Sequence, residues 1–316
     1  MARLSGHLWT IAPAARSRFA PVAPEPGAEP FRLTVQDPEI GAVDVTGRLR
    51  RAGDGRRAAL LLHGLGGSAQ SVYLAPLERE LGRHGWTTLA LNQRGCDREG
   101  GDLHHAGFTA DLPRVAATEP LARAERLALV GISLGGHVAL RWATEAHDPR
   151  LVALVAICAP VDLELGARSL DRPSGWFYRS YLLRALNEVY REVAARRPLP
   201  HPVARVERAR TIREWDGLVV APRFGFASAE DYYARASVAP RLDRLDRPAL
   251  LVWSEEDPMV PPETVRPALG RLPAGARAIW TRRGGHVGFP ADLDLGLGGG
   301  PGLAAQVAAW LDATAR

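Results

Sequence analysis

The sequence predicts an α/β protein with a mostly parallel, doubly wound sheet and a helical insertion before the last strands. Short apolar runs alternate with amphipathic segments between residues 58 and 157, as expected for parallel strands joined by crossover helices. Two earlier strand-like runs follow each other without a helix and predict an antiparallel edge. The alternation stops at residue 159 and resumes near residue 249, which predicts an inserted helical cap.

Each core element has its own apolar pattern. The expected strands are 31–35, 42–49, 58–62, 87–91, 126–131, 151–157, 248–253 and 276–280. The expected helices between them are 71–84, 110–122 and 134–146. The cap is assigned to 159–246, so the core has a first part, 1–158, and a second part, 247–316. Ligands bind at the carboxyl ends of the strands in such sheets, which makes the loops after the strands the first candidates for a site.

Composition excludes several classes of protein. A chain of 316 residues that is 46% hydrophobic can bury a substantial core, so one core plus a cap is expected. Its two cysteines, Cys96 and Cys158, are too few for a disulfide scaffold and are expected to be reduced thiols. All 40 basic residues are arginine and are interspersed with 35 acidic ones, which favours a mixed solvated surface over a nucleic-acid interface.

The N-terminal stretch shows no targeting or membrane signal. It is interrupted by Pro13 and is too short for the apolar core of a signal peptide or for a membrane span. We therefore expect a cytoplasmic protein without an integral membrane segment.

The segment 131–135 reads Gly-Ile-Ser-Leu-Gly and lies between an expected strand and an expected helix. A G-x-S-x-G sequence in that context is typical of a nucleophile elbow, a sharp turn that exposes the serine oxygen at the end of a sheet. Small residues at 131 and 135 allow the tight turn. Ser133 is therefore the candidate nucleophile, and the alternative is an ordinary serine cap at a helix start.

The segment 63–67, His-Gly-Leu-Gly-Gly, follows the strand 58–62 directly. In hydrolases with a nucleophile elbow, such a loop and the residue after the nucleophile donate the backbone N–H groups of an oxyanion hole. These donors are expected to be Leu65 and Leu134, with His63 anchoring the loop. A phosphate-binding loop is excluded because the G-K-[ST] ending is absent and the chain contains no lysine.

The candidate acid and base lie late in the chain. Asp257 follows the strand 248–253 and precedes Pro258, which favours a turn there. His286 lies in the loop after 276–280, and an imidazole with an ordinary pKa near 6.5 can accept the serine proton at neutral pH. The order Ser, Asp, His is the one this kind of fold requires. Asp162, after the strand 151–157, is the alternative acid.

Other histidines are interpreted as structural. His137 lies on the helix that leads away from Ser133 and is badly placed to turn back to it. His104 and His105 lie in a loop rich in glycine and aspartate, but no further ligands stand at a recognisable zinc spacing. No metal and no cofactor are expected.

The cap begins with a segment rich in aromatic and apolar residues at nearly helical spacing. These residues are Trp176, Phe177, Tyr181, Leu182, Leu186, Val189, Tyr190 and Val193. Either they pack on the core, or some of them, with Trp176 and Phe177 as candidates, line a substrate pocket. A second helix is expected over 203–215.

Several segments together resemble the YheT-like branch of the α/β-hydrolases, which includes ABHD-type lipases and short-chain acyl esterases. The similar segments are 6–10, 92–96, 213–216, 225–226, 231–233 and 285–289. The resemblance implies an α/β-hydrolase fold and a carboxylic ester hydrolase with Ser133, Asp257 and His286 as its triad. This chain departs from the branch at Trp9, where glutamine is frequent, and in a longer Gly/Pro-rich stretch, 294–302.

The function expected from these features is that of a serine carboxylesterase acting on short- to medium-chain acyl esters, with monoacylglycerols among the candidates. The partner is a small-molecule ester, and the oligomeric state stays open. Acyl transfer and thioester hydrolysis would use the same site. A catalytically silent ligand-binding protein on the same scaffold is the alternative from another class.

Overall fold

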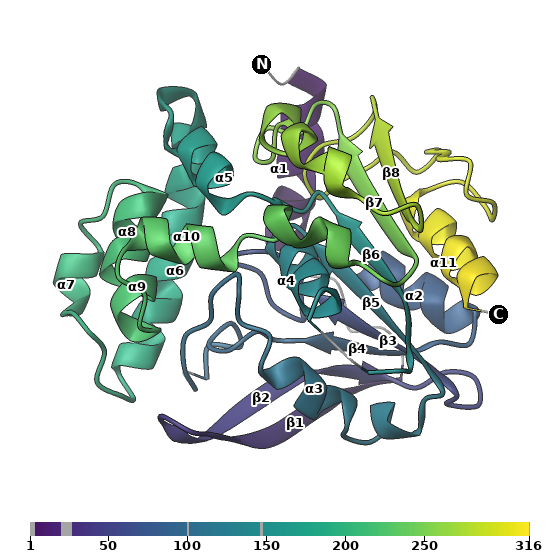
Figure 1. Ribbon diagram of the computed structural model, residues 1–316, viewed down its shortest axis with the longest axis horizontal. Helices are drawn as coiled ribbons and strands as arrows, with labels where there is room; N and C mark the ends of the chain where they lie inside the picture. The colour runs from purple at the N-terminus through teal and green to yellow at the C-terminus, as the bar shows by residue number, and fades with distance from the viewer. Residues whose placement is uncertain (1–3, 20–26, 100, 146–147, 316) are drawn as a thin grey trace.

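The computed structural model describes residues 4–19, 27–99, 101–145 and 148–315, and Figure 1 shows their arrangement. Eight strands of the described chain form one sheet in the order β1-β2-β4-β3-β5-β6-β7-β8. The strands are β1 (Ala28–Asp37), β2 (Gly41–Arg50), β3 (Arg57–Leu62), β4 (Thr87–Leu91), β5 (Arg126–Ile132), β6 (Leu151–Ile157), β7 (Ala249–Ser254) and β8 (Ala276–Thr281). β1 and β2 pair antiparallel at the edge, β2 pairs antiparallel with β4, and the other pairs are parallel. The predicted fold class is confirmed.

Helices cover both faces of the sheet, as a doubly wound topology requires. Along β3, Leu60 and Leu62 belong to one apolar cluster and Leu61 belongs to the other, because neighbouring side chains of a strand point to opposite faces. The first cluster also contains residues of α3 (Asp111–Ala116) and α4 (Leu134–Ala143). The second contains residues of α2 (Ala75–Arg83) and α11 (Leu303–Thr314).

The helix expected over 110–122 is shorter than predicted. α3 ends at Ala116, and a separate 3₁₀ turn, η1, follows at Leu121–Arg123. Pro120 explains the break, because proline has no N–H to donate and disfavours helical geometry at the residue before it.

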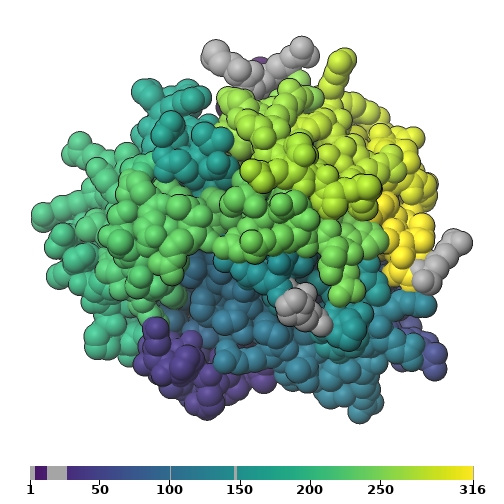
Figure 2. All heavy atoms as spheres, in the orientation of Figure 1, coloured from purple at the N-terminus to yellow at the C-terminus, as the bar shows by residue number. Residues whose placement is uncertain are grey.

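Between β6 and β7 the chain forms helices, and we define this insertion, residues 159–246, as the cap. Its helices are α5 (Leu163–Asp171), α6 (Trp176–Ala194), α7 (Val203–Val206), α8 (Ile212–Leu218), α9 (Val220–Arg223) and α10 (Ala229–Ala236), with 3₁₀ turns at η2 (Pro173–Gly175) and η3 (Ala239–Arg244). Figure 1 shows α6 to α10 to the left of the strands, and in Figure 2 the teal and green residues form a continuous surface on that side. They share a third buried cluster, which also includes Leu103 and Ala106 of the core and which Leu65 and Leu134 contact.

The prediction of a single helix over 203–215 is wrong. The chain forms α7 and then, after a gap, α8. Thr211 stops a continuous helix, because its backbone is extended and its side chain accepts a hydrogen bond from the Glu214 N–H as the cap of α8.

The N-terminal helix α1 (Leu4–Phe19) was not expected from the sequence. It packs closely against the loop after β7: a Cβ atom on Gly6 would lie 2.0 Å from the Glu256 carbonyl oxygen, so only glycine fits there. Within the described ranges, no helix combines the length and the apolar character needed to cross a membrane. The remaining 3₁₀ turns, η4 (Pro262–Thr264) and η5 (Arg266–Arg271), lie between β7 and β8.

Candidate active site

Ser133 lies at the turn between β5 and α4 with φ 56° and ψ −125°. Positive φ is unfavourable for a residue with a side chain, so the turn must be held by its surroundings. A Cβ atom on Gly131 would lie 2.2 Å from the Gly135 carbonyl oxygen, and one on Gly135 would lie 2.2 Å from the Leu62 oxygen. The serine side chain makes no capping hydrogen bond to α4, which argues against the alternative of an ordinary helix cap.

The structure brings Ser133, His286 and Asp257 together. The distance from Ser133 Oγ to His286 Nε2 is 2.7 Å, and that from His286 Nδ1 to Asp257 Oδ2 is 2.8 Å. Because a carboxylate only accepts, His286 donates from Nδ1 and is free to accept the serine proton at Nε2. The other carboxylate oxygen, Asp257 Oδ1, accepts backbone N–H bonds from Met259 at 2.8 Å and Val260 at 2.9 Å.

The rival residues lie elsewhere. Asp162 caps α5 and accepts a hydrogen bond of 2.9 Å from the Leu165 N–H. His137 points to the carbonyl oxygens of Pro160 and Ala236, at 2.7 and 3.0 Å, and ties α4 to the end of the cap.

The two histidines of the 104–105 pair are also engaged. His104 Nδ1 lies 2.9 Å from the Arg94 carbonyl oxygen. His105 is surrounded by the rings of Phe108, Phe224 and Tyr232. Neither belongs to a group of ligands suited to a metal within the described residues.

Both cysteines are free and buried, as predicted. The described part of the chain has one compact group of metal-ligating side chains, Cys158, Asp257 and His286. This group fits a metal poorly, because Asp257 and His286 already bind each other. Burial also raises the pKa of the Cys158 thiol well above its usual range, which disfavours the thiolate that a metal needs.

The helix α1 supports the loop that carries His286. Thr10 Oγ1 accepts the His286 backbone N–H at 2.9 Å and donates to the Gly6 carbonyl oxygen at 2.7 Å. A Cβ atom on Gly285 would lie 2.5 Å from Thr10 Oγ1. Ser5 is hydrogen-bonded to Glu256, next to the candidate acid. The sequence reasoning missed these roles, although the segment 6–10 was one of those similar to the YheT-like branch.

The loop after β3 passes beside the candidate nucleophile. A Cβ atom on Gly64 would lie 2.9 Å from the Ser133 Cβ, and the Gly64 N–H donates to the Tyr73 hydroxyl at 3.0 Å. Leu65 and Leu134 both line the same cavity as Ser133.

His63 is fully buried and its ring holds this loop. Its Nδ1 lies 2.8 Å from the Gly64 carbonyl oxygen, and its Nε2 accepts the Gln93 N–H at 3.2 Å. Burial lowers the pKa of His63 to about 4, so the ring is neutral at pH 7.

A cavity of about 850 Å³ opens above Ser133 and His286 and extends into the cap. Phe177 lines it, together with Leu182 and Leu186 of α6. Trp176, the other candidate pocket residue, is not among the lining residues and is 60% exposed. The structure therefore separates the two candidates.

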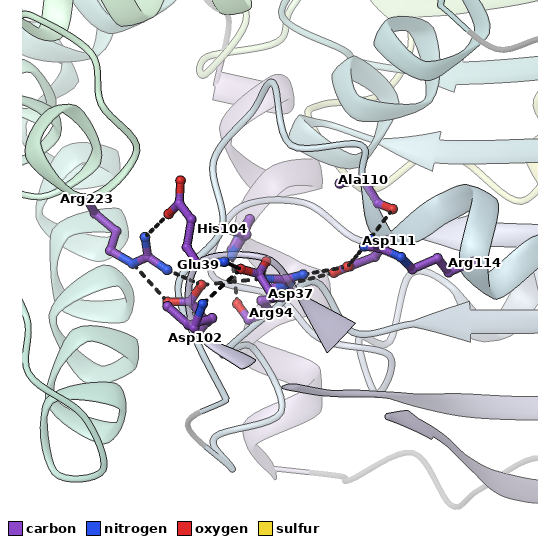
Figure 3. A network of polar contacts seen from close by, with 10 residues as sticks. Asp37, Glu39, Arg94, Asp102, His104, Ala110, Asp111, Arg114 and Arg223 are labelled. Atoms are coloured by element: carbon purple, nitrogen blue, oxygen red, sulfur yellow. Dashed lines mark hydrogen bonds and ion pairs between the residues drawn. The ribbon is translucent and has the colours of Figure 1, made fainter. Parts of the chain in front are cut away.

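A buried charge network joins the core to the cap (Figure 3). Arg94 donates to Asp111 at 2.7 Å and to Asp37 at 2.7 Å, and lies 3.5 Å from Asp102. Asp102 in turn accepts a hydrogen bond of 2.7 Å from Arg223 of α9. Because Asp102 is fully buried, loss of Arg223 would leave its charge with only the 3.5 Å contact to Arg94, which is costly in the interior.

Comparison with known proteins places this geometry in context. Residues 59–294 match the model of the "Alpha/beta hydrolase family". The chain is 33% identical over 243 residues to "Putative esterase YheT" of Escherichia coli (strain K12), covering 73% of this chain and 69% of that protein. It is 27% identical over 263 residues to "Medium-chain fatty acid ethyl ester synthase/esterase 2" of Saccharomyces cerevisiae, covering 73% of this chain but 57% of that protein.

The chain thus spans little more than half the length of the yeast relative. Among solved structures, the Pyrococcus furiosus esterase Pf2001 superposes with a TM-score of 0.54 at 18% identity. That superposition covers 82% of this chain and 85% of the other, and it supports the fold.

Proposed function

The chain belongs to the alpha/beta hydrolase family, in the branch that contains YheT, and we propose that it is a serine carboxylic ester hydrolase. Its substrates are short- to medium-chain acyl esters, with monoacylglycerols as one candidate. The observation that carries the proposal is the unbroken hydrogen-bond chain from Ser133 through His286 to Asp257 at the floor of an apolar cavity.

In the proposed reaction His286 removes the proton of Ser133 as the serine oxygen attacks the ester carbonyl. The backbone N–H groups of Leu65 and Leu134 stabilise the oxyanion. The protonated His286 gives its proton to the departing alcohol, and Asp257 stabilises the imidazolium. Water, activated by the same histidine, then hydrolyses the acyl-enzyme and restores the free serine.

Acyl transfer is the second candidate, and the yeast relative, named as both a synthase and an esterase, motivates it. An alcohol would replace water in the second half of the reaction. Adding ethanol during hydrolysis of an acyl ester and measuring the ratio of ethyl ester to free acid separates the two activities. A thioesterase, tested with acyl thioesters of the same chain length, would use the same residues.

The Ser133→Ala variant tests the proposed function. We expect ester turnover to fall by roughly 10⁵ to 10⁶, because the acyl-enzyme route is lost while the fold is kept. A fluorophosphonate probe should label the parent protein and leave the variant unlabelled. A variant that kept most of its activity would contradict the nucleophile, and a parent protein that hydrolysed no ester and took up no probe would indicate a silent ligand-binding protein.

A further inference from the structure

A carboxylate lines the catalytic cavity. Among the described lining residues, Asp216 of α8 is the only aspartate or glutamate. Its side chain lies on the cap side of the cavity, where Ile212, Trp215 and Val220 form an apolar wall. Asp216 is 8% exposed, and its Oδ2 accepts a hydrogen bond of 2.6 Å from the hydroxyl of Tyr233 on α10, which lines the same cavity.

The charged groups around Asp216 do not neutralise it. Arg213, on the same helix, forms its ion pairs with Glu164 and Glu230. Asp171 of α5 has the same sign of charge and accepts the backbone N–H groups at the start of α8.

Tyr232 and Tyr233 face Asp216 from α10. Burial raises the pKa of Asp216 to about 7 with help from Asp171, while Tyr233 and Arg213 oppose the shift. Both protonation states are therefore populated near neutral pH.

A carboxyl group is a costly choice for holding Tyr233. A neutral amide could accept the same hydrogen bond without burying a titratable group in an apolar wall. A carboxyl group has two oxygens, and the hydrogen bond from Tyr233 occupies one of them, Oδ2. A ligand in the cavity can supply the donor for the other.

We propose that Asp216, held in place by Tyr233, binds a hydroxyl group of the substrate on the cap side of the catalytic cavity. This inference rests on the proposed esterase function and narrows its substrates to esters that carry a hydroxyl group away from the scissile bond. An ammonium group would be a poor occupant, because the apolar wall makes its desolvation far more costly than that of a neutral hydroxyl.

The hydroxyl can belong to either part of the ester. In a monoester of a polyol it belongs to the alcohol part, and in a hydroxyacyl ester it belongs to the acyl chain. Two matched pairs of substrates distinguish these sources: 2,3-dihydroxypropyl octanoate against propyl octanoate, and ethyl 8-hydroxyoctanoate against ethyl octanoate. The measured quantity is the ratio of kcat/KM for the hydroxylated ester to kcat/KM for its plain partner.

We expect this ratio to be about tenfold in one of the two pairs for the parent protein, as for a hydrogen bond to a charged group. Asp216→Ala should bring it close to one. Asp216→Asn should keep part of the preference but remove its pH dependence, whereas in the parent the preference should rise as pH rises through 7. Glu214→Gln, an exposed change on the same helix, is the matched control and should leave the ratio unchanged.

Equal losses of activity toward both members of each pair in Asp216→Ala would assign Asp216 a structural role and overturn the inference. A ratio near one in the parent for both pairs would overturn it as well. If Asp216→Ala does not fold, Tyr233→Phe replaces it, because loss of the hydroxyl that holds Asp216 must also lower the ratio. Hydrolysis of the plain esters that depends on Ser133 supports the proposed function whatever the ratio, so the two ideas fail separately.

Discussion

The substitution Asp257→Asn tests the proposed acid through its two oxygens, which have different partners. Oδ1 accepts two backbone N–H groups, from Met259 and Val260, and Oδ2 accepts Nδ1 of His286. An asparagine must leave its carbonyl oxygen on the two N–H donors, because its NH₂ group cannot accept them. The NH₂ group then faces His286 and donates to Nδ1. The imidazole is forced to carry its proton on Nε2, where it can no longer accept the proton of Ser133.

The expected loss in kcat is roughly 10³ to 10⁴, or about 4 to 5.5 kcal/mol of transition-state stabilisation. KM should change little, since Asp257 is not among the residues that line the cavity. The measurement is the steady-state hydrolysis of p-nitrophenyl butyrate, with kcat and KM determined separately. Urea unfolding of parent and variant checks that the fold is kept.

Asp162→Asn is the matched control. Asparagine caps a helix about as well as aspartate, so α5 should keep its N-terminal hydrogen bond and kcat should stay within about twofold of the parent. If folded Asp257→Asn kept more than about a tenth of the parent kcat, the tautomer argument would be refuted. A large loss in Asp162→Asn instead would move the acid to the end of β6.

Three further changes test separate parts of the structure. Thr10→Val should lower kcat because it leaves the buried backbone N–H of His286 without an acceptor, at a cost of about 1 to 3 kcal/mol, and Thr10→Ser should restore it. Phe177→Ala should shift the preference among p-nitrophenyl esters to longer acyl chains, and kcat/KM should increase about fourfold for each methylene that the enlarged cavity accepts. Trp176→Ala should leave the preferred chain length unchanged. Burial lowers the pKa of His63 to about 4 in the folded protein, whereas in the unfolded chain it is near 6.5. The unfolded chain therefore binds an extra proton below pH 6.5, and the free energy of unfolding should decrease by on the order of 3 kcal/mol as the pH is lowered from 6.5 to 4. Urea unfolding across that range should show a shallower decline in His63→Gln, and an identical decline would contradict the assignment.

The strands of the core could be predicted from the sequence because each is a short apolar run bounded by polar or turn-forming residues. The expected strands 87–91 and 151–157 agree with β4 and β6 residue for residue. Strands buried on both faces have this pattern regardless of what packs on them. The meeting of Ser133, Asp257 and His286 follows from the same topology, since the loops after parallel strands converge at one edge of the sheet.

The parts that depend on distant contacts could not be predicted. The α1 helix is held by Gly6 and Thr10 against loops more than 240 residues away, and no local pattern reveals those partners. The hydrogen bond between Asp216 and Tyr233 joins α8 to α10, with α9 between them in the chain, so it also requires the folded cap.

Trp176 illustrates a different limit. The buried positions of α6 include Tyr178, Leu182, Leu186, Tyr190 and Val193, which recur at intervals of three or four residues. This spacing forms one face of a helix, and Trp176 lies off that face. The spacing of residues along this segment therefore already separates Trp176 from the buried face of the helix. Treating all its aromatic residues as one group concealed that difference.

Contacts from α9 and α10 to the core hold the cap in position over the triad. His137 joins α4 to Ala236, and the buried carboxylate of Asp102 joins Arg94 of the core to Arg223 of the cap. Swinging the whole cap away would expose or unpair that carboxylate, at a cost that a small ester cannot offset by binding. The apolar lining residues Ile11, Phe177 and Tyr181 are 38%, 46% and 51% exposed, so the mouth of the cavity lies between α1 and α6. We therefore expect substrates to enter past these side chains while the cap stays in place, and a disulfide that fixed the cap to the core near Arg223 should leave kcat/KM unchanged; a large drop that reduction reverses would show that the cap must open.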